Sequence, residues 1–145
     1  MSDLGFKELK ILNLNGNEIT DIIVLKKFNF KSLIKLDLSC NKISNIKILD
    51  EIDLKELEEL FLNNNQISDI NVLDKTNCKE LTKLKLNNNE ISDINVLRKV
   101  NLKELKELRL SGNKIYDINI LEKVNFKKLE KLSLNNNEIT DIKIL

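Results

Sequence analysis

The stretch LTKLKLNNNEI, from Leu81 to Ile91, contains the pattern that predicts the fold of this chain. It reads Leu-x-x-Leu-x-Leu-x-x-Asn-x-Ile, and the same pattern returns every 24 residues without a slip. A fixed period of this length indicates an array of stacked structural repeats. The pattern begins at Leu9, Leu33, Leu57, Leu81, Leu105 and Leu129.

The second and third leucines of each pattern predict a short strand with one buried face. Leu84 and Leu86 are two residues apart, so both point to one side of a strand while Lys85 points to the other. One repeat cannot bury its leucines alone, and neighbouring repeats must therefore stack with their strands in a parallel sheet. Curvature of the stack then gives a concave sheet.

An aspartate column predicts short helices on the opposite, convex side. An Asp precedes Ile-x-x-Leu in nearly every repeat, which is typical of a helix N-cap followed by apolar residues one turn apart. We therefore expect an α/β solenoid with a parallel concave β-sheet and short helices or 3₁₀ turns on the convex side. The column consists of Asp21, Asp69, Asp93, Asp117 and Asp141, with Asn45 in the remaining repeat.

A further column of apolar residues predicts a second buried row and separates the two cysteines. Cys78 belongs to this row and is expected to be a core thiol, whereas Cys40 lies beside an asparagine column. Such unlike environments argue against a disulfide between them. The row contains Phe6, Phe30, Leu54, Cys78, Leu102 and Phe126.

The repeat pattern resembles the leucine-rich-repeat family from end to end. The tails Ile-Ser-Asp-Ile-x-Val-Leu and Ile-Thr-Asp-Ile are similar to the short internalin-like and phosphatase-regulator-like classes, although those usually have repeats of about 22 residues. The resemblance implies a non-catalytic module that binds a protein partner on its concave face. It also implies one solenoid over 1–145, with a partial repeat at 1–8, full repeats at 9–32, 33–56, 57–80, 81–104 and 105–128, and a partial repeat at 129–145.

Composition argues against several other classes of function. The chain has no histidine, which removes the commonest general base and metal ligand, and the repeats hold no Gly-rich phosphate loop or Cys-x-x-Cys pair. A net charge of +1 gives no summed field that would attract nucleic acid or an anionic membrane. We therefore expect no enzymatic activity, no metal or other cofactor, and no nucleic-acid or membrane partner.

The open face of the predicted sheet offers the candidate binding residues. Its first column alternates in charge from Lys35 to Lys131, and opposite charges on adjacent strands stabilise pairing. Its second column places an aromatic side chain, expected to be exposed, next to two cations, and Phe and Arg are favoured interface anchors. The predicted partner-binding residues are Asp37, Phe61, Lys85 and Arg109.

Two polar columns have both a structural and a functional interpretation. The asparagine column that includes Asn65 and Asn89 follows each strand, where buried amides satisfy the turning backbone, and ligand binding is the weaker alternative. The aspartate column could be a row of calcium ligands, yet helix capping already compensates the stacked carboxylates. Both columns are therefore interpreted as part of the fold.

The two ends of the array lack the polar caps that normally close a solenoid. The sequence at Leu145 would continue almost in register into Ser2 of a second copy. Self-assembly head-to-tail, as a structural protein, is therefore the alternative function, and it would form a filament or a closed ring. The expected end-to-end contacts are Leu4, Phe6, Ile142, Ile144 and Leu145.

Targeting signals are not seen in the sequence. The first eight residues contain no basic segment followed by an apolar run, and no window approaches the ~18 apolar residues of a membrane-spanning helix. These features and the two unlike cysteines favour a cytoplasmic location. An extracellular location is the alternative if the chain is a fragment.

Overall fold

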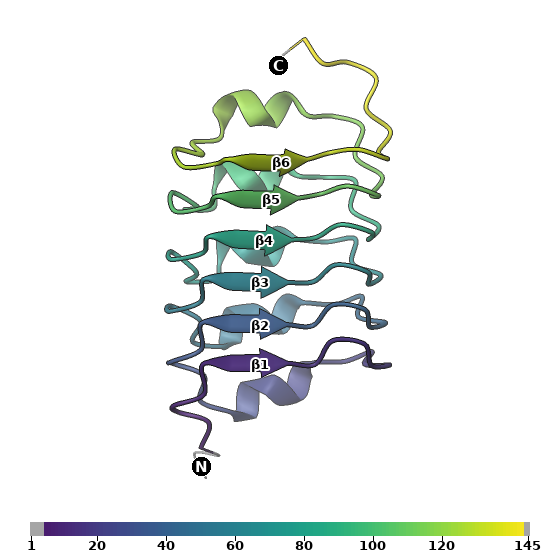
Figure 1. Cartoon of the computed structure of the whole chain (residues 1–145). Coiled ribbons are helices and arrows are strands. Elements are labelled where there is room, and N and C mark those ends of the chain that lie inside the picture. The colour runs from purple at the N-terminus through teal and green to yellow at the C-terminus, as the bar shows by residue number, and fades with distance from the viewer. Residues whose placement is uncertain (1–4, 144–145) are drawn as a thin grey trace.

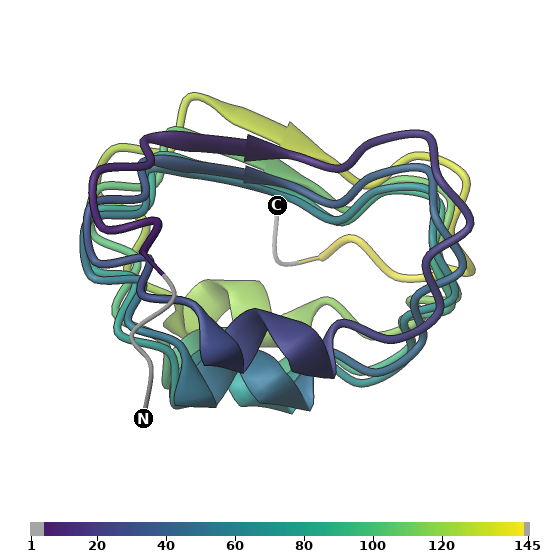
Figure 2. The same cartoon turned by 90° about the horizontal axis from the view of Figure 1, so that it is seen from below.

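The computed structural model describes residues 5–143, which form one stack of coils with a sheet on one side and 3₁₀ helices on the other (Figures 1 and 2). The sheet is parallel, and its strands follow one another in chain order. This arrangement confirms the predicted leucine-rich-repeat solenoid. The strands are β1 (Ile11–Asn13), β2 (Lys35–Asp37), β3 (Glu59–Phe61), β4 (Lys83–Lys85), β5 (Glu107–Arg109) and β6 (Lys131–Ser133).

The convex side carries five short 3₁₀ helices among the described residues, one after each of the first five strands. Figure 2 shows them as a layer opposite the sheet, with the chain turning between the two layers at each edge. Five residues or fewer in each helix are enough to return the chain toward the next strand. The helices are η1 (Ile23–Lys27), η2 (Lys47–Glu51), η3 (Asn71–Asp74), η4 (Asn95–Arg98) and η5 (Asn119–Lys123).

Each strand pairs with the next at equivalent positions of the repeat. Leu36 is opposite Leu60, and Leu60 is opposite Leu84, so the middle leucines form one buried ladder. These leucines are at most 1% exposed in β2 to β5. The first and third residues of each strand point to the other side of the sheet, which we call the open face.

The asparagine column forms a buried ladder that joins each repeat to the one before it. Asn89 Nδ2 donates to Leu86 O at 3.0 Å and to Leu62 O of the preceding repeat at 2.9 Å. Its Oδ1 accepts from Ile67 N of that repeat at 3.0 Å. The amide thus satisfies backbone groups of two repeats at the turn, as the structural interpretation predicts.

The aspartate column caps the 3₁₀ helices from a position one residue earlier than expected. Residue 22 occupies the N-cap of η1 and makes no side-chain cap bond, whereas Asp21 precedes it. Asp21 Oδ1 nevertheless accepts from Ile23 N at 2.8 Å, and Asp69 and Asp93 make the same bond in their repeats. The prediction of the capping bond was right and the N-cap position was wrong, because the side chain closes a turn over two residues.

The second apolar row is buried only where repeats lie on both sides of it. Phe30, Leu54, Cys78 and Leu102 are buried, which confirms Cys78 as a core thiol. Phe6 is 47% exposed and Phe126 is only partly buried, so their predicted burial was wrong. Among the described residues no repeat precedes Phe6, and its ring instead contacts Phe28 at a centroid distance of 5.1 Å.

Candidate functional site

The candidate site is the open face of the sheet, where the strands place the predicted residues in one row. Asp37 is opposite Phe61, Phe61 is opposite Lys85, and Lys85 is opposite Arg109. The register therefore brings all four predicted binding residues together on adjacent strands. Their exposure and their partners differ from the expectation.

Phe61 is not the exposed aromatic side chain that the sequence predicts. The residue is 8% exposed, because two lysines from the neighbouring strands lie over its ring. Lys85 Nζ is 4.1 Å from the ring centroid and Lys35 Nζ is 4.5 Å from it. Long lysine stems cover apolar surface while their ammonium groups meet the ring face. The expected exposure was wrong, and the surface that Phe61 supports is cationic.

Asp37 is also buried, and its carboxylate is held by the turn after its own strand. The residue is 8% exposed. Its Oδ1 accepts from Ser39 Oγ at 2.5 Å and from Ser39 N at 3.1 Å. These bonds direct the carboxylate toward the backbone rather than toward a partner.

The alternating charges of the first column lie opposite one another, as predicted. Glu59 Oε1 is 2.7 Å from Lys83 Nζ, and Glu59 Oε2 is 3.4 Å from Lys35 Nζ. The hydrogen bond with Lys83 lowers the pKa of Glu59 and raises the pKa of Lys83. One carboxylate is therefore shared by two lysines, in a partly exposed arrangement whose contribution to stability is small.

Glu107 pairs along its strand rather than across to the neighbouring lysines. Its Oε1 accepts from Arg109 Nε, two residues further along β5. This hydrogen bond is the main reason that the pKa of Glu107 is lowered, and Lys85 and Lys131 add to it through space. Arg109 remains exposed, while the Glu107 side chain is only 11% exposed. Sequence alternation did not predict this pairing.

Among residues 5–143, two cations of the open face form no ion pair. Within residues 5–143, no carboxylate oxygen lies within 4.0 Å of Lys85 Nζ or Lys131 Nζ. The carboxylates of this face are already engaged, since Asp37 bonds to Ser39 and the two glutamates bond to other cations. The face therefore has positive charge left over for a ligand.

The polar turn that follows each strand borders the open face, and its left-handed backbone was not predicted from the sequence. Asn64, Asn88 and Cys40 have φ values between 54° and 56°, a region that favours glycine. Asn88 Nδ2 donates to Asn64 Oδ1 at 2.7 Å, and Asn64 Nδ2 donates to Cys40 Sγ at 3.4 Å. Gly16 and Gly112 at the same repeat position were the signal that could have revealed this row.

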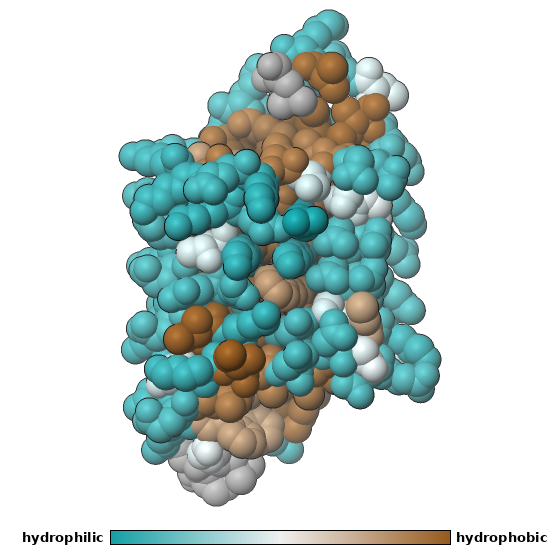
Figure 3. Space-filling view, viewed as in Figure 1, coloured by the Kyte–Doolittle hydropathy of each residue, from teal (hydrophilic) through white to brown (hydrophobic). Residues whose placement is uncertain are grey.

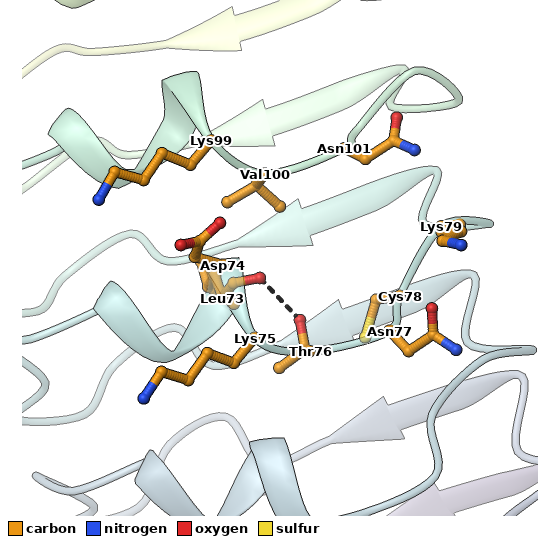
Figure 4. A pocket seen from close by; sticks show the side chains of 10 residues that line it. All are labelled: Leu73, Asp74, Lys75, Thr76, Asn77, Cys78, Lys79, Lys99, Val100 and Asn101. Carbon is orange, nitrogen blue, oxygen red and sulfur yellow. Dashed lines mark hydrogen bonds between the residues drawn. The ribbon is translucent and has the colours of Figure 1, made fainter.

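A depression of about 370 Å³ lies between the chain segments that follow η3 and η4 (Figure 4). Thr76 Oγ1 donates to Leu73 O at 2.9 Å beneath it, and burial raises the pKa of the Cys78 thiol to about 11. A thiol with such a pKa stays protonated and is a poor nucleophile at neutral pH. Cys78 is therefore not an activated nucleophile at this depression.

The described residues contain neither a cluster of metal ligands nor a helix that could span a membrane. Across 5–143, no group of three or more His, Cys, Asp or Glu side chains could hold a metal ion. In that range, too, no helix has the length and apolar character needed to cross a membrane. The cytoplasmic location stays a prediction.

Solved structures similar to this chain include bacterial and plant leucine-rich-repeat proteins. An internalin of Listeria monocytogenes is 28% identical with a TM-score of 0.80, over 94% of this chain and 37% of its own. A second internalin from that organism is 34% identical with a TM-score of 0.75, over 88% of this chain and 52% of its own. The chain thus spans about half of these relatives or less.

A plant relative was solved with a bound partner. The leucine-rich-repeat ectodomain of an Arabidopsis thaliana membrane receptor kinase, in complex with Casparian strip integrity factor 2, is 25% identical with a TM-score of 0.71. The similarity covers 90% of this chain and 16% of that one. No curated protein matches the chain.

Family models cover most of the chain. The model described as leucine-rich repeats in two copies matches residues 55–99 and 103–145, and a single leucine-rich-repeat model matches residues 8–26 and 31–46. These matches include every strand of the sheet. The chain belongs to the leucine-rich-repeat family.

Proposed function

We propose that this chain is a non-catalytic module that binds a protein partner on the open face of its sheet. The observation that carries the proposal is the group of cations that strands β4 to β6 place on the open face, where Lys85 is opposite Arg109 and Lys131 is opposite Glu107. Leucine-rich-repeat domains generally mediate protein–protein interactions, and the plant ectodomain described above is one that was solved with a partner. A rigid platform with accessible charges suits recognition, because little ordering is needed on binding.

The proposed role without catalysis is supported by the state of the ionisable groups. Catalytic acids and bases usually have perturbed pKa values in a cleft. Here the shifted carboxylates, Glu59 and Glu107, are ion-paired on an open surface, and their pKa values are lowered, which suits structural pairing rather than proton transfer. The buried thiol of Cys78 is held in its neutral form.

The test compares a variant of the open face with a matched variant of the convex side. Lys85→Gln with Arg109→Gln removes two charges and keeps the first two methylene groups and a polar end of each side chain. Lys75→Gln with Lys99→Gln removes the same charge from exposed positions at the convex side. Each purified protein is immobilised, and proteins captured from an extract of the source cells are quantified.

We expect specific partners to be retained by the wild type and the convex variant and lost by the open-face variant. Circular dichroism of each variant confirms that the repeats still fold. Partners that are retained equally by all three proteins would contradict binding on the open face. Phe61→Ala is the weaker choice for this test, because truncating a buried ring also disturbs packing.

A second candidate function is head-to-tail self-assembly through the ends of the stack. Apolar side chains are exposed there, with Phe6 at 47%, Leu132 at 38% and Ile142 at 65%. Figure 3 shows hydrophobic surface gathering toward both ends of the molecule, while the middle of the strand face is mostly hydrophilic. Of the predicted end contacts, Leu4, Ile144 and Leu145 lie outside the described residues.

Light scattering with size-exclusion chromatography tests this candidate over a wide range of concentration. Self-assembly predicts a mass that rises with concentration and falls back to the monomer in Leu132→Glu, which places a charge on the exposed end. Lys75→Gln with Lys99→Gln is the control and should assemble like the wild type. A monomer at every concentration would exclude head-to-tail assembly of this chain.

A further inference from the structure

The charge of the open face is divided unequally along the stack. Strands β4 to β6 present four cations and one carboxylate on this face, a net charge of +3. Strands β1 to β3 present one cation and two carboxylates, a net charge of −1. The residues of the positive half, which we call the cationic patch, are Lys83, Lys85, Glu107, Arg109 and Lys131.

The internal ion pairs leave the cationic patch unbalanced. Lys83 shares Glu59 with Lys35, so this glutamate neutralises only one of the two lysines. Glu107 is engaged by Arg109 through Nε, which leaves the terminal nitrogens of the guanidinium directed away from that bond. Lys85 and Lys131 have no carboxylate within 4.0 Å among the described residues.

We infer that the partner presents an acidic polypeptide segment, rich in Asp and Glu, to the cationic patch on β4 to β6. The inference rests on the proposed function and names the chemistry of the partner. Carboxylates of the segment would complete the ion pairs that the sheet leaves open, and Arg109 can receive two oxygens at once. The net negative charge on β1 to β3 disfavours binding of the acidic segment to that half of the open face. The segment should therefore lie over β4 to β6.

A polypeptide suits this patch better than a nucleic acid does. Single-stranded nucleic acids bind where bases stack on exposed aromatic rings along a positive groove. The aromatic ring of this face, Phe61, is 8% exposed and is covered by Lys35 and Lys85. Among the described residues, the cationic patch therefore presents no exposed ring on which a base could stack.

The test is selection of short random peptides displayed on phage against the folded chain. Selected phage are then compared on two variants of equal charge. The patch variant lacks the unbalanced cations and carries Lys85→Gln, Arg109→Gln and Lys131→Gln. The control variant loses three lysines from one repeat position of the convex side and carries Lys75→Gln, Lys99→Gln and Lys123→Gln. We expect peptides that bind the wild type and the control, but not the patch variant, to have more Asp and Glu than Lys and Arg.

The best such peptide is then synthesised and its affinity measured by fluorescence anisotropy. We expect at least about tenfold weaker binding to the patch variant, and weaker binding to the wild type as salt is raised above about 0.15 M. Neutral or basic peptides that depend on the patch would overturn the acidic inference and leave the proposed function standing. Selection of no peptide that depends on the patch would overturn both. Tighter binding of a single-stranded oligonucleotide of equal charge would also overturn the inference.

Discussion

Repeats in the middle of the stack and repeats at its ends have nearly the same sequence pattern but very different burial. The middle leucine of the strand is 0% exposed at Leu84 and 38% exposed at Leu132. Both residues occupy the same position of their repeats and pair with leucines of the adjacent strand. The difference in exposure shows that the leucines of a repeat are buried by the neighbouring repeats, as expected of a solenoid stabilised by interfaces between repeats.

The largest effect expected from this comparison is loss of a central leucine. Leu84→Ala removes a fully buried side chain and leaves a cavity between three strands, which should lower the free energy of unfolding by about 3–5 kcal/mol. Leu132→Ala should lower it by less than half as much, because the side chain is already partly hydrated. Denaturant unfolding followed by circular dichroism measures both.

Equal losses of unfolding free energy in Leu84→Ala and Leu132→Ala would contradict the difference in burial between these two leucines. They would show that Leu132 is covered in solution, and the light-scattering experiment would then identify the cover as a second copy or not. The comparison of Leu84 with Leu132 therefore also tests the self-assembly candidate.

The asparagine ladder should show the next largest difference. Asn89→Ala leaves the amide of Ile67 without its buried acceptor, and it removes one of the two asparagine donors from each of the carbonyls of Leu62 and Leu86, which should cost about 2–3 kcal/mol. Asn17 is exposed and donates at 3.0 Å to Leu14 O of its own repeat, so Asn17→Ala should cost under about 1 kcal/mol. Hydrogen exchange at Ile67 N checks the ladder directly, since its protection should fall in Asn89→Ala and persist in Asn17→Ala.

Period and alternation in the sequence predicted the fold and its register because these depend on the backbone. A 24-residue spacing places equivalent residues side by side, as observed for Glu59 and Lys83. The asparagine ladder and the core position of Cys78 also follow from position within the repeat. These features need no knowledge of where any side chain points beyond its face of the strand.

Details of the candidate site depend on side-chain conformations that a repeat pattern does not contain. Phe61 is buried because Lys35 and Lys85 both fold over its ring, whereas its position alone predicted exposure. Glu107 had cations on both neighbouring strands and one on its own, and the choice of Arg109 depends on the local geometry. Exposure of Phe6 depends on what lies beyond it in the stack.

A smaller effect is the pH dependence of stability, which should come from the burial of Cys78 in the second apolar row. The pKa of Cys78 rises from its ordinary value of 9.0 to about 11 because burial disfavours the thiolate. The folded chain therefore holds the proton more tightly than the unfolded chain. This contribution is fully present below pH 9.0 and is lost as the pH rises from there to about 11.

Cys78→Ala isolates this effect from the lysines that titrate in the same range. The difference in free energy of unfolding between the wild type and Cys78→Ala should shift by about 1–3 kcal/mol against the wild type across that range. Cys40→Ala is the matched control, in which a thiol is removed from an exposed position. A flat difference for Cys78→Ala would mean that the thiol is hydrated in the folded state.

The smallest effect compares the two glycines of the turn row. Gly16 and Gly112 have φ values of 72° and 66°, so alanine at either position costs about 1–2 kcal/mol from the left-handed backbone alone. A Cβ at Gly16 would have nothing within 4 Å, whereas one at Gly112 would lie 2.2 Å from Asn88 Oδ1. Gly112→Ala should therefore lose about 1 kcal/mol more than Gly16→Ala, because Asn88 must move away from Asn64.

A double-mutant cycle separates the two causes. Asn88→Gly removes the side chain that meets the new Cβ and tolerates the φ of 55° at that position. Gly112→Ala should then cost about as much in the Asn88→Gly background as Gly16→Ala does in the wild type, a coupling of about 1 kcal/mol. If the losses of free energy from Gly112→Ala and Asn88→Gly simply add, the Asn88 side chain moves aside at no cost. The contact between these repeats would then involve only backbone atoms. A measured coupling would instead show that side chains of the turn row transmit packing from one central repeat to the next, which Gly16 at the end of the stack does not do.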